Sequence, residues 1–152
     1  MKGKKYILLI VVLLIAILLT TTTASAKATR IDFTINETCN DDLVWQRAWE
    51  AGPNFHLQGL TQTCIEDGSI PQATGIAYLY DGSVHLVDGQ VSMTGSSRME
   101  TLEGGVWDGR WTYTAGVFEY VGHGEGIYAG QQYFSISNQN GNVKGYILVT
   151  GQ

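Results

Sequence analysis

The sequence predicts an all-β protein, a single closed antiparallel β-barrel of about eight strands. From residue 30 onward, apolar and polar residues alternate with a period of two, which is typical of strands with one buried face. Asx-Gly pairs separate the alternating segments, and no window of residues 27–152 gives a convincing helix. Eighteen glycines lie in that range, and glycine inside strands lets a sheet coil sharply and close on itself. These observations favour a barrel over a two-sheet sandwich.

Residues 1–26 precede this domain and have the composition of a secretory signal peptide. Three lysines are followed by fourteen apolar residues, a threonine run and Ala24-Ser25-Ala26, which together give the basic, apolar and small-residue regions of such a peptide. We therefore expect cleavage after Ala26 and a β-barrel domain over residues 27–152, secreted or otherwise extracytoplasmic. A membrane anchor through residues 6–23 is the alternative, since the threonines could extend a span that is short of about 20 residues.

The expected strands are short and follow one another closely. The clearest alternation is in Ile31, Phe33 and Ile35, and it recurs along the chain in the following sets: Phe55 and Leu57; Ile76, Tyr78 and Tyr80; Val84 and Leu86; Trp107, Trp111 and Tyr113; Phe118 and Tyr120; Tyr133, Ser135 and Ser137; Val143, Gly145, Ile147 and Val149. The segment 41–51 fits a helix and a strand, and we favour a strand. The count is eight to ten strands.

Five Asx-Gly pairs predict where the chain turns, because Asx-Gly tolerates positive φ and suits type I′ hairpins. Asp81-Gly82 has the best flanking alternation and predicts a hairpin. Asp108-Gly109 interrupts a strand pattern that continues on both sides, so that a bulge is as good an expectation as a turn. The other pairs are Asp67-Gly68, Asp88-Gly89 and Asn140-Gly141.

Charge and cysteine content limit the possible partners. Residues 27–152 hold six basic and fourteen acidic residues, which argues against nucleic acid as a partner and, after signal cleavage, against an anionic membrane surface.

Cys39 and Cys64 are the two cysteines, and in an exported chain they predict one disulfide. Their spacing lacks the CxxC pattern of metal sites, so we expect no metal there.

The stretch YVGHGEGIYAG, residues 120–130, is the most unusual segment. Gly124 to Ala129 formally matches the GxGxxA dinucleotide fingerprint, but that motif works only where a strand turns into a helix, and no helix is expected here. In a continuous strand Gly122, Gly124 and Gly126 share one face, with His123 and Glu125 on the other. A bare face of this kind admits a neighbouring aromatic ring or lets the strand bend.

The segment VGHGEGIYAGQQYFSI resembles the glycine-rich segment of the allene oxide cyclase and dirigent barrel families, through Gly124, Gly126, Tyr128 and Gly130. The upstream GGVWDGRWTYT is similar to a glycine-rich strand in small bacterial relatives of that barrel, and the resemblance covers residues 74–150. It implies an eight-stranded, calycin-like barrel whose apolar lumen binds a hydrophobic small molecule, and in some members steers a cyclisation. The families' catalytic positions do not match this chain.

Aromatic and polar side chains provide the candidate ligand-binding residues, since aromatics with a few polar tips line small-molecule pockets. The same residues also make ordinary barrel cores, and we favour the core for most of them. The candidates are Trp45, Arg47, Trp49, His56, Tyr78, Trp107, Trp111 and Tyr113.

Catalytic and metal motifs have little support. No GxSxG, HxH or HExxH pattern occurs, so we expect no catalytic residue, cofactor or metal ligand, and treat His56, His85 and His123 as separate surface or edge residues. Three functions stay open: a binding protein for a small, mostly apolar ligand; an isomerase or cyclase that uses the same lumen; and a structural or interaction protein with a filled core. The volume of the lumen distinguishes the third function from the other two: a lumen of several hundred Å³ favours ligand binding, and a packed interior argues against it. An enzyme should also bury an ionisable group with a shifted pKa, and Arg47, Glu50 and His56 are the candidates.

Overall fold

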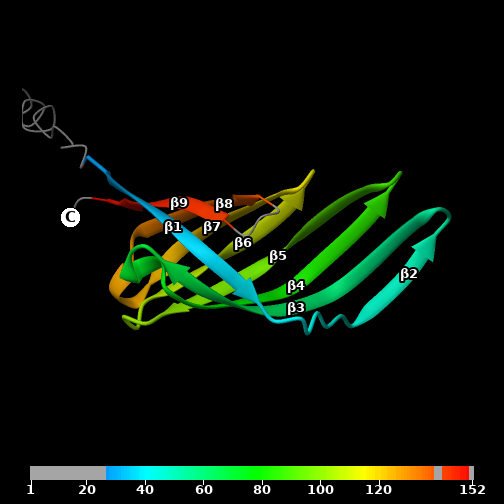
Figure 1. The fold of residues 1–152 in the computed structure, drawn as a ribbon, viewed down its shortest axis with the longest axis horizontal. Coiled ribbons are helices and arrows are strands. Elements are labelled where there is room, and N and C mark those ends of the chain that lie inside the picture. Colours follow the sequence, from blue (N-terminus) through cyan, green and yellow to red (C-terminus); the bar gives the residue numbers. More distant parts are fainter. Residues whose placement is uncertain (1–26, 139–141, 151–152) are drawn as a thin grey trace, which may run out of the picture.

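The computed structural model describes residues 27–138 and 142–150 and is all-β over that range (Figure 1). Nine antiparallel strands form one sheet. They are β1 (Thr29–Cys39), β2 (Arg47–Ala51), β3 (Asn54–Gly68), β4 (Gly75–Val87), β5 (Gln90–Thr101), β6 (Val106–Thr114), β7 (Val117–Glu125), β8 (Gln131–Asn138) and β9 (Asn142–Val149). The described residues include two short 3₁₀ turns, η1 (Pro71–Ala73) and η2 (Gly126–Tyr128), and no α-helix. The prediction of an all-β chain is thus confirmed.

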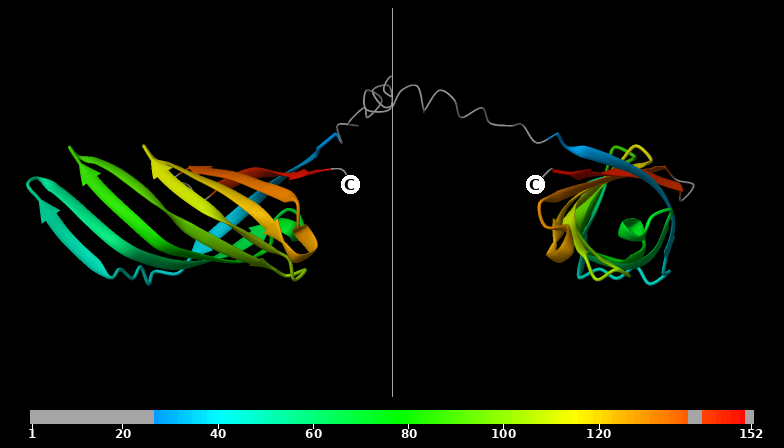
Figure 2. Two further views of the ribbon diagram at one scale, coloured as in Figure 1. Left: turned by 180° about the vertical axis from the view of Figure 1, so that it is seen from behind. Right: turned by 90° about the vertical axis from the view of Figure 1, so that its left-hand side faces the viewer.

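The strands form a ring of eight, which is visible when the molecule is viewed end-on (Figure 2, right). Seven neighbouring pairs in the ring follow the order β1-β9-β8-β7-β6-β5-β4-β3, and an additional pairing of β1 with β3 closes it. We call this pairing the seam; it aligns Ile35 with Gly68 and Cys39 with Cys64. Strand β2 lies outside the ring, at the edge of the sheet, where it pairs with the first residues of β3.

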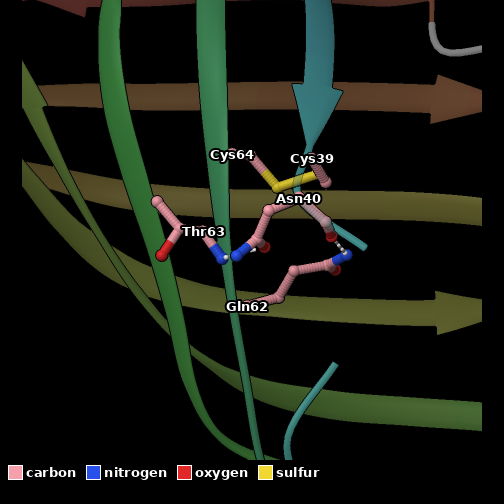
Figure 3. The surroundings of a disulfide bond; sticks show 5 residues. All are labelled: Cys39, Asn40, Gln62, Thr63 and Cys64. Carbon is pink, nitrogen blue, oxygen red and sulfur yellow. Dashed lines mark hydrogen bonds between the residues drawn. A yellow bond between two sulfur atoms is a disulfide. The ribbon is translucent and has the colours of Figure 1, made fainter. Parts of the chain in front are cut away.

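The seam carries the disulfide that the two cysteines predict. Cys39 and Cys64 face each other across β1 and β3 and are bonded (Figure 3). Asn40 extends the pairing past the end of β1: its amide donates to the carbonyl of Thr63 at 3.0 Å, and its Oδ1 accepts from the amide of Thr63 at 3.1 Å. The Gln62 side chain donates to the Asn40 carbonyl at 3.0 Å. Covalent and hydrogen bonds therefore hold the ring closed at one end of the seam.

The interior is lined by alternate residues of each strand, as the period of two predicts. The largest fully buried side chains are Trp107, Trp111, Tyr133 and Ile147. Trp107 stacks on Tyr128, with ring centroids 4.7 Å apart, and its indole nitrogen donates to the carbonyl of Gln72 in η1 at 2.8 Å. The turn η1 lies across one opening of the ring (Figure 2, right) and buries Ala73 completely. The core therefore extends to that end of the ring.

Glycines let aromatic rings lie against the backbone of neighbouring strands. A side chain at Gly95 would overlap the ring of Trp111, and one at Gly145 would overlap the ring of Phe33. On β7, Gly122 and Gly124 share one face as predicted; it is the face turned to the interior, and His123 is exposed. Gly126 differs from the prediction, because β7 ends at Glu125 and Gly126 begins η2 with φ of +62°.

The predicted turns are only partly correct. Asp88-Gly89 forms the two-residue hairpin between β4 and β5, with both φ angles positive. The hairpin predicted at Asp81-Gly82 is wrong: the pair is a bulge within β4, because the register against β5 shifts between Tyr80 and Ser83. Asp108-Gly109 forms neither a bulge nor a turn, since β6 pairs regularly through both residues. Asn140-Gly141 falls outside the described residues.

The segment 41–51 is a strand only from Arg47 onward, with an isolated bridge between Val44 and Thr61 before it. No helix among the described residues is long and apolar enough to cross a membrane. The predicted signal peptide over residues 1–26, and the alternative anchor through residues 6–23, lie outside the described range.

Candidate functional site

Three of the eight predicted ligand-binding residues line the ring interior together. Trp107 and Trp111 are fully buried, and Tyr113 is half-buried at the same parity on β6. The Trp111 indole donates to the carbonyl of Ser96 at 2.9 Å, and its ring stacks on Phe118. Both tryptophans are therefore packed and hydrogen-bonded as core residues, in agreement with the core interpretation.

Four others gather around β2, outside the ring. Trp45 is exposed in the connection that precedes β2. The Arg47 guanidinium lies 4.9 Å from the Trp49 ring, and Trp49 stacks on His56 with centroids 5.1 Å apart. Arg47 and Glu50, two of the three candidates for a buried catalytic group, are exposed, whereas His56 is half-buried.

Tyr78, the last of the eight, lies apart from both groups. It alternates with the buried Ala77 and Leu79 on β4 and is 40% exposed on the outer face. Ile76, Tyr78 and Tyr80 share a face as predicted, but it is the face that points away from the core.

A carboxyl pair that the sequence analysis missed lies inside the ring at the seam. Glu37 on β1 and Glu66 on β3 occupy facing positions, two pairs away from the disulfide. Glu66 is 7% exposed, and one of its carboxyl oxygens has no hydrogen-bond partner among the described residues. Burial, the charge of Glu37 and a hydrogen bond with Glu37 raise the pKa of Glu66 to about 8. Burial also raises the pKa of Glu37. At neutral pH, therefore, Glu66 is protonated and donates a hydrogen bond to Glu37.

Tyrosines and small polar residues surround this pair. Tyr120 is 7% exposed, and its hydroxyl has no hydrogen-bond partner among the described residues. Burial is the main cause that raises the pKa of Tyr120 and of Tyr133, so both stay neutral. The cavity between these groups measures about 30 Å³ and is lined by Ile35, Glu37, Glu66, Ala77, Leu79, Ser97, Met99, Phe118, Tyr120, Tyr133, Ser135 and Val143. This is the volume of about one water molecule in the liquid, far below the several hundred Å³ of ligand pockets.

Within the described residues, one group of at least three potential metal ligands comes together, namely Glu37, Cys39 and Cys64. The two sulfur atoms are bonded to each other, so neither is a thiolate that could bind a metal. The disulfide state therefore leaves only the carboxylate of Glu37 in this group.

A larger hollow lies on the outside of the ring, over β1, β7, β8 and β9. We call it the outer groove; its volume is about 600 Å³, and its lining comprises Arg30, Asp32, Phe33, Thr34, Glu119, Tyr120, Val121, Phe134, Ser135, Ile136, Lys144, Gly145 and Tyr146. Three other surface hollows have similar volumes but a more polar lining. Apolar lining with a few polar groups is typical of small-molecule sites.

Cross-strand pairing organises the outer groove. Phe134 and Tyr146 face each other across β8 and β9, and their rings stack at 4.9 Å. The Arg30 guanidinium covers the other face of Tyr146 at 3.9 Å and pairs with Asp32 at 2.8 Å. Val121 and Ile136 add exposed aliphatic surface. Phe134, Tyr146 and Arg30 therefore form one continuous stack on the outer face of the sheet.

Two further charges border the outer groove. Lys144 on β9 is exposed and has no ion pair within the described part of the chain. Glu119 on β7 is also exposed and is separated from Lys144 by Ile136 on β8. Since the Arg30 charge is already paired, Lys144 is the cation of the groove that is available to an anionic ligand.

The sequence held a signal for the carboxyl pair. Glu37 continues the inward parity of Phe33 and Ile35, and an antiparallel pairing anchored at the predicted disulfide places Glu37 opposite Glu66. The outer groove had no comparable signal, because its residues come from strands whose order in the sheet was not predicted.

Comparison of the chain with protein-family models, with curated proteins and with solved structures finds no match.

Proposed function

We propose that this chain is an exported binding protein that holds a small, mostly apolar ligand with an anionic group in the outer groove. The observation that carries the proposal is the contrast in volume between the apolar outer groove, about 600 Å³, and the interior cavity, about 30 Å³. A pocket of several hundred Å³ accommodates a small organic molecule. The disulfide is consistent with an extracytoplasmic location.

The chemistry of the outer groove supports a ligand with two parts. An apolar or aromatic body would pack against the edges of Phe134 and Tyr146 and against Ile136, which is 49% exposed. Burying apolar area contributes about 25 cal/mol per Å², so this body supplies most of the affinity. A carboxylate or sulfonate on the ligand would meet the ammonium group of Lys144. An exposed ion pair adds no more than about 1 kcal/mol and thus serves mainly to orient the ligand.

Two other functions remain as proposals of lower rank. An isomerase or cyclase in the lumen would have a buried acid in Glu66, but the cavity beside it holds no substrate-sized volume. A structural or interaction protein would fit the filled interior and would leave the outer groove without a small ligand. The ring of eight strands is compatible with a barrel of the allene oxide cyclase or dirigent type, and membership in that superfamily is likewise a proposal.

The probe for the test is 2-naphthoate, which has a flat aromatic body and one carboxylate. We expect saturable binding to the purified, oxidised protein, measured by amide chemical shifts in 15N-labelled samples, with the largest shifts at residues of the outer groove. Ile136→Thr should weaken binding several-fold, because it removes apolar contact area, and Lys144→Gln should weaken it to a smaller extent.

The matched control is Ile65→Thr, since Ile65 is 60% exposed on β3 and does not line the outer groove. This variant should bind 2-naphthoate like the unaltered protein. Shifts confined to residues of the interior cavity, or equal losses in the Ile65 and Ile136 variants, would contradict the proposal. The absence of saturable binding would favour the interaction protein.

A further inference from the structure

Two of the three histidines, which the sequence left far apart, meet in the folded chain. His56 on β3 and His85 on β4 occupy facing positions, and their Nδ1 atoms lie 2.9 Å apart. The rings meet edge to face, with centroids 5.1 Å apart. The sequence did not predict this pair, because a hairpin was expected at Asp81-Gly82, whereas β4 continues through these residues and pairs with β3 on both sides of them.

The pair lies on the side of the sheet that points away from the core. The adjacent cross-strand pair is Leu57 with Val84, and Val84 packs against the buried cluster. Because successive residues of a strand point to opposite faces, the two histidines project to the other side. Both are half-buried, so solvent and dissolved ions reach them.

Trp49 fixes the orientation of this pair. It faces His56 across β2 and β3, and its indole stacks on the His56 ring with an interplanar angle of 20°. A metal-binding imidazole is normally oriented through a hydrogen bond from its other ring nitrogen, and here the ring stack restrains His56. The stack therefore reduces the freedom that His56 would lose on binding an ion.

The separation of the two nitrogens matches a chelate. For metal–nitrogen bonds of about 2.0–2.1 Å meeting at a right angle, the two nitrogens are about 2.9 Å apart. Right-angled nitrogen ligands are typical of tetragonal Cu²⁺ and Ni²⁺, and Cu²⁺ has the highest affinity of the divalent first-row ions. We propose that His56 and His85 form a surface chelate for a divalent transition-metal ion, which binds Cu²⁺ most tightly, with water completing the coordination.

Binding requires a change of tautomer and a turn of the rings that directs both Nδ1 lone pairs at one ion, and it involves no redox step. In the metal-free pair one Nδ1–H donates to the other Nδ1. For both Nδ1 lone pairs to bind the ion, the donating ring carries its proton on Nε2 instead. Both imidazoles stay neutral, and the ion exchanges two of its water ligands for two nitrogens.

The test is titration of the purified, oxidised protein with Cu²⁺, followed by electron paramagnetic resonance and by quenching of tryptophan fluorescence. We expect one ion per chain, hyperfine coupling to two nitrogens, and weaker binding of Ni²⁺. His56→Asn or His85→Asn should lower the Cu²⁺ affinity at least about tenfold, the loss that even changes outside the ligand shell cause.

His123→Asn is the matched control, because His123 is exposed on β7 and does not contact the pair. It should leave both the affinity and the two-nitrogen signal unchanged. His56→Gln and His85→Gln give a second pair of variants, and near-ultraviolet circular dichroism confirms that each variant is folded. Unchanged Cu²⁺ binding in folded variants of His56 and His85, or loss of binding in the His123 variant, would overturn the proposal. Binding of 2-naphthoate to the outer groove should be the same with and without Cu²⁺, so the two proposals fail independently.

Discussion

Two regions of the ring interior bury polar atoms in opposite ways. Beside η1, the indole of Trp107 donates to a backbone carbonyl, and the hydroxyl of Tyr128 bonds with Thr101 and Glu103. At the seam, Glu66 and Tyr120 each bury a polar atom that lacks a partner within the described residues. In the first region the buried polar groups are satisfied, and in the second two of them are not. The second region adjoins the pairing of β1 with β3 that closes the ring, two residue pairs from the disulfide.

Loss of a core indole should have the largest effect. Trp107→Ala removes a fully buried side chain that packs on Tyr128 and Tyr133, and we expect it to lower the free energy of unfolding by about 3–5 kcal/mol. Urea denaturation followed by circular dichroism measures this. Trp45→Ala, at an exposed position, is the control and should change stability by less than about 0.5 kcal/mol. Similar losses in both variants would contradict the core assignment.

Removal of the disulfide should come next. The bond joins residues 25 positions apart, and in the chain-entropy account a crosslink of this span contributes about 3 kcal/mol. The double variant Cys39→Ser, Cys64→Ser should lose that amount in urea denaturation, and amide hydrogen exchange should accelerate first along β1 and the facing part of β3. Uniform acceleration around the ring would show that the seam is no weaker than the other strand pairs.

The carboxyl pair should make stability depend on pH. The pKa of Glu66 is raised from 4.5 to about 8, so the folded state holds the proton more tightly than the unfolded chain. Its contribution is fully present below about pH 4.5 and is lost as the pH rises toward 8. Between pH 5 and pH 7 the loss is on the order of 2.5 kcal/mol.

Glu66→Gln should remove most of this dependence and should be the more stable form at pH 8, which urea denaturation at several pH values measures. Glu37, Tyr120 and Tyr133 face the same cavity, and the two tyrosines stay neutral over this range. Glu125→Gln, at an exposed carboxylate on the outer face, is the control. Parallel pH profiles for the Glu66 variant and the unaltered protein would contradict a raised pKa.

Two tyrosine substitutions give the smallest and most direct contrast between the two regions. Tyr128→Phe removes hydrogen bonds to Thr101 and Glu103 and should lower stability by about 1–2 kcal/mol. Tyr120→Phe removes a hydroxyl that has no partner among the described residues and should be neutral or stabilising. Thermal or urea unfolding measures the stability of both variants, and a greater loss for Tyr120→Phe would reverse the assignment of the satisfied and unsatisfied regions.

Local patterns in the sequence predicted the strands, the disulfide and the packed tryptophans. The alternation of apolar and polar residues shows which side chains of a strand are buried, and a chain with two cysteines allows one intramolecular disulfide. The hairpin at Asp88-Gly89 followed from the same chemistry. The same chemistry gave the wrong prediction at Asp81-Gly82, because an Asx-Gly pair with positive φ suits a bulge as well as a hairpin turn. The choice depends on the register with β5, which is set by contacts far along the chain.

The sites were harder to predict for the same reason. His56 and His85 meet because β4 continues through Asp81-Gly82, where a hairpin was expected, and the outer groove needs the spatial order of β1, β9, β8 and β7. Glu37 and Glu66 were the exception that could have been found, because the disulfide fixes the register between their strands. Long-range pairing, rather than residue type, is therefore what the sequence left undetermined.

The central claim is that a small ligand binds outside the ring and not within it. Intermolecular nuclear Overhauser effects between 2-naphthoate and labelled methyl groups test this most directly, since Ile136 lines the outer groove and Met99 lines the interior cavity. We predict cross-peaks from the naphthalene protons to the Ile136 methyls and none to the Met99 methyl. Cross-peaks to Met99 without any to Ile136 would contradict the claim.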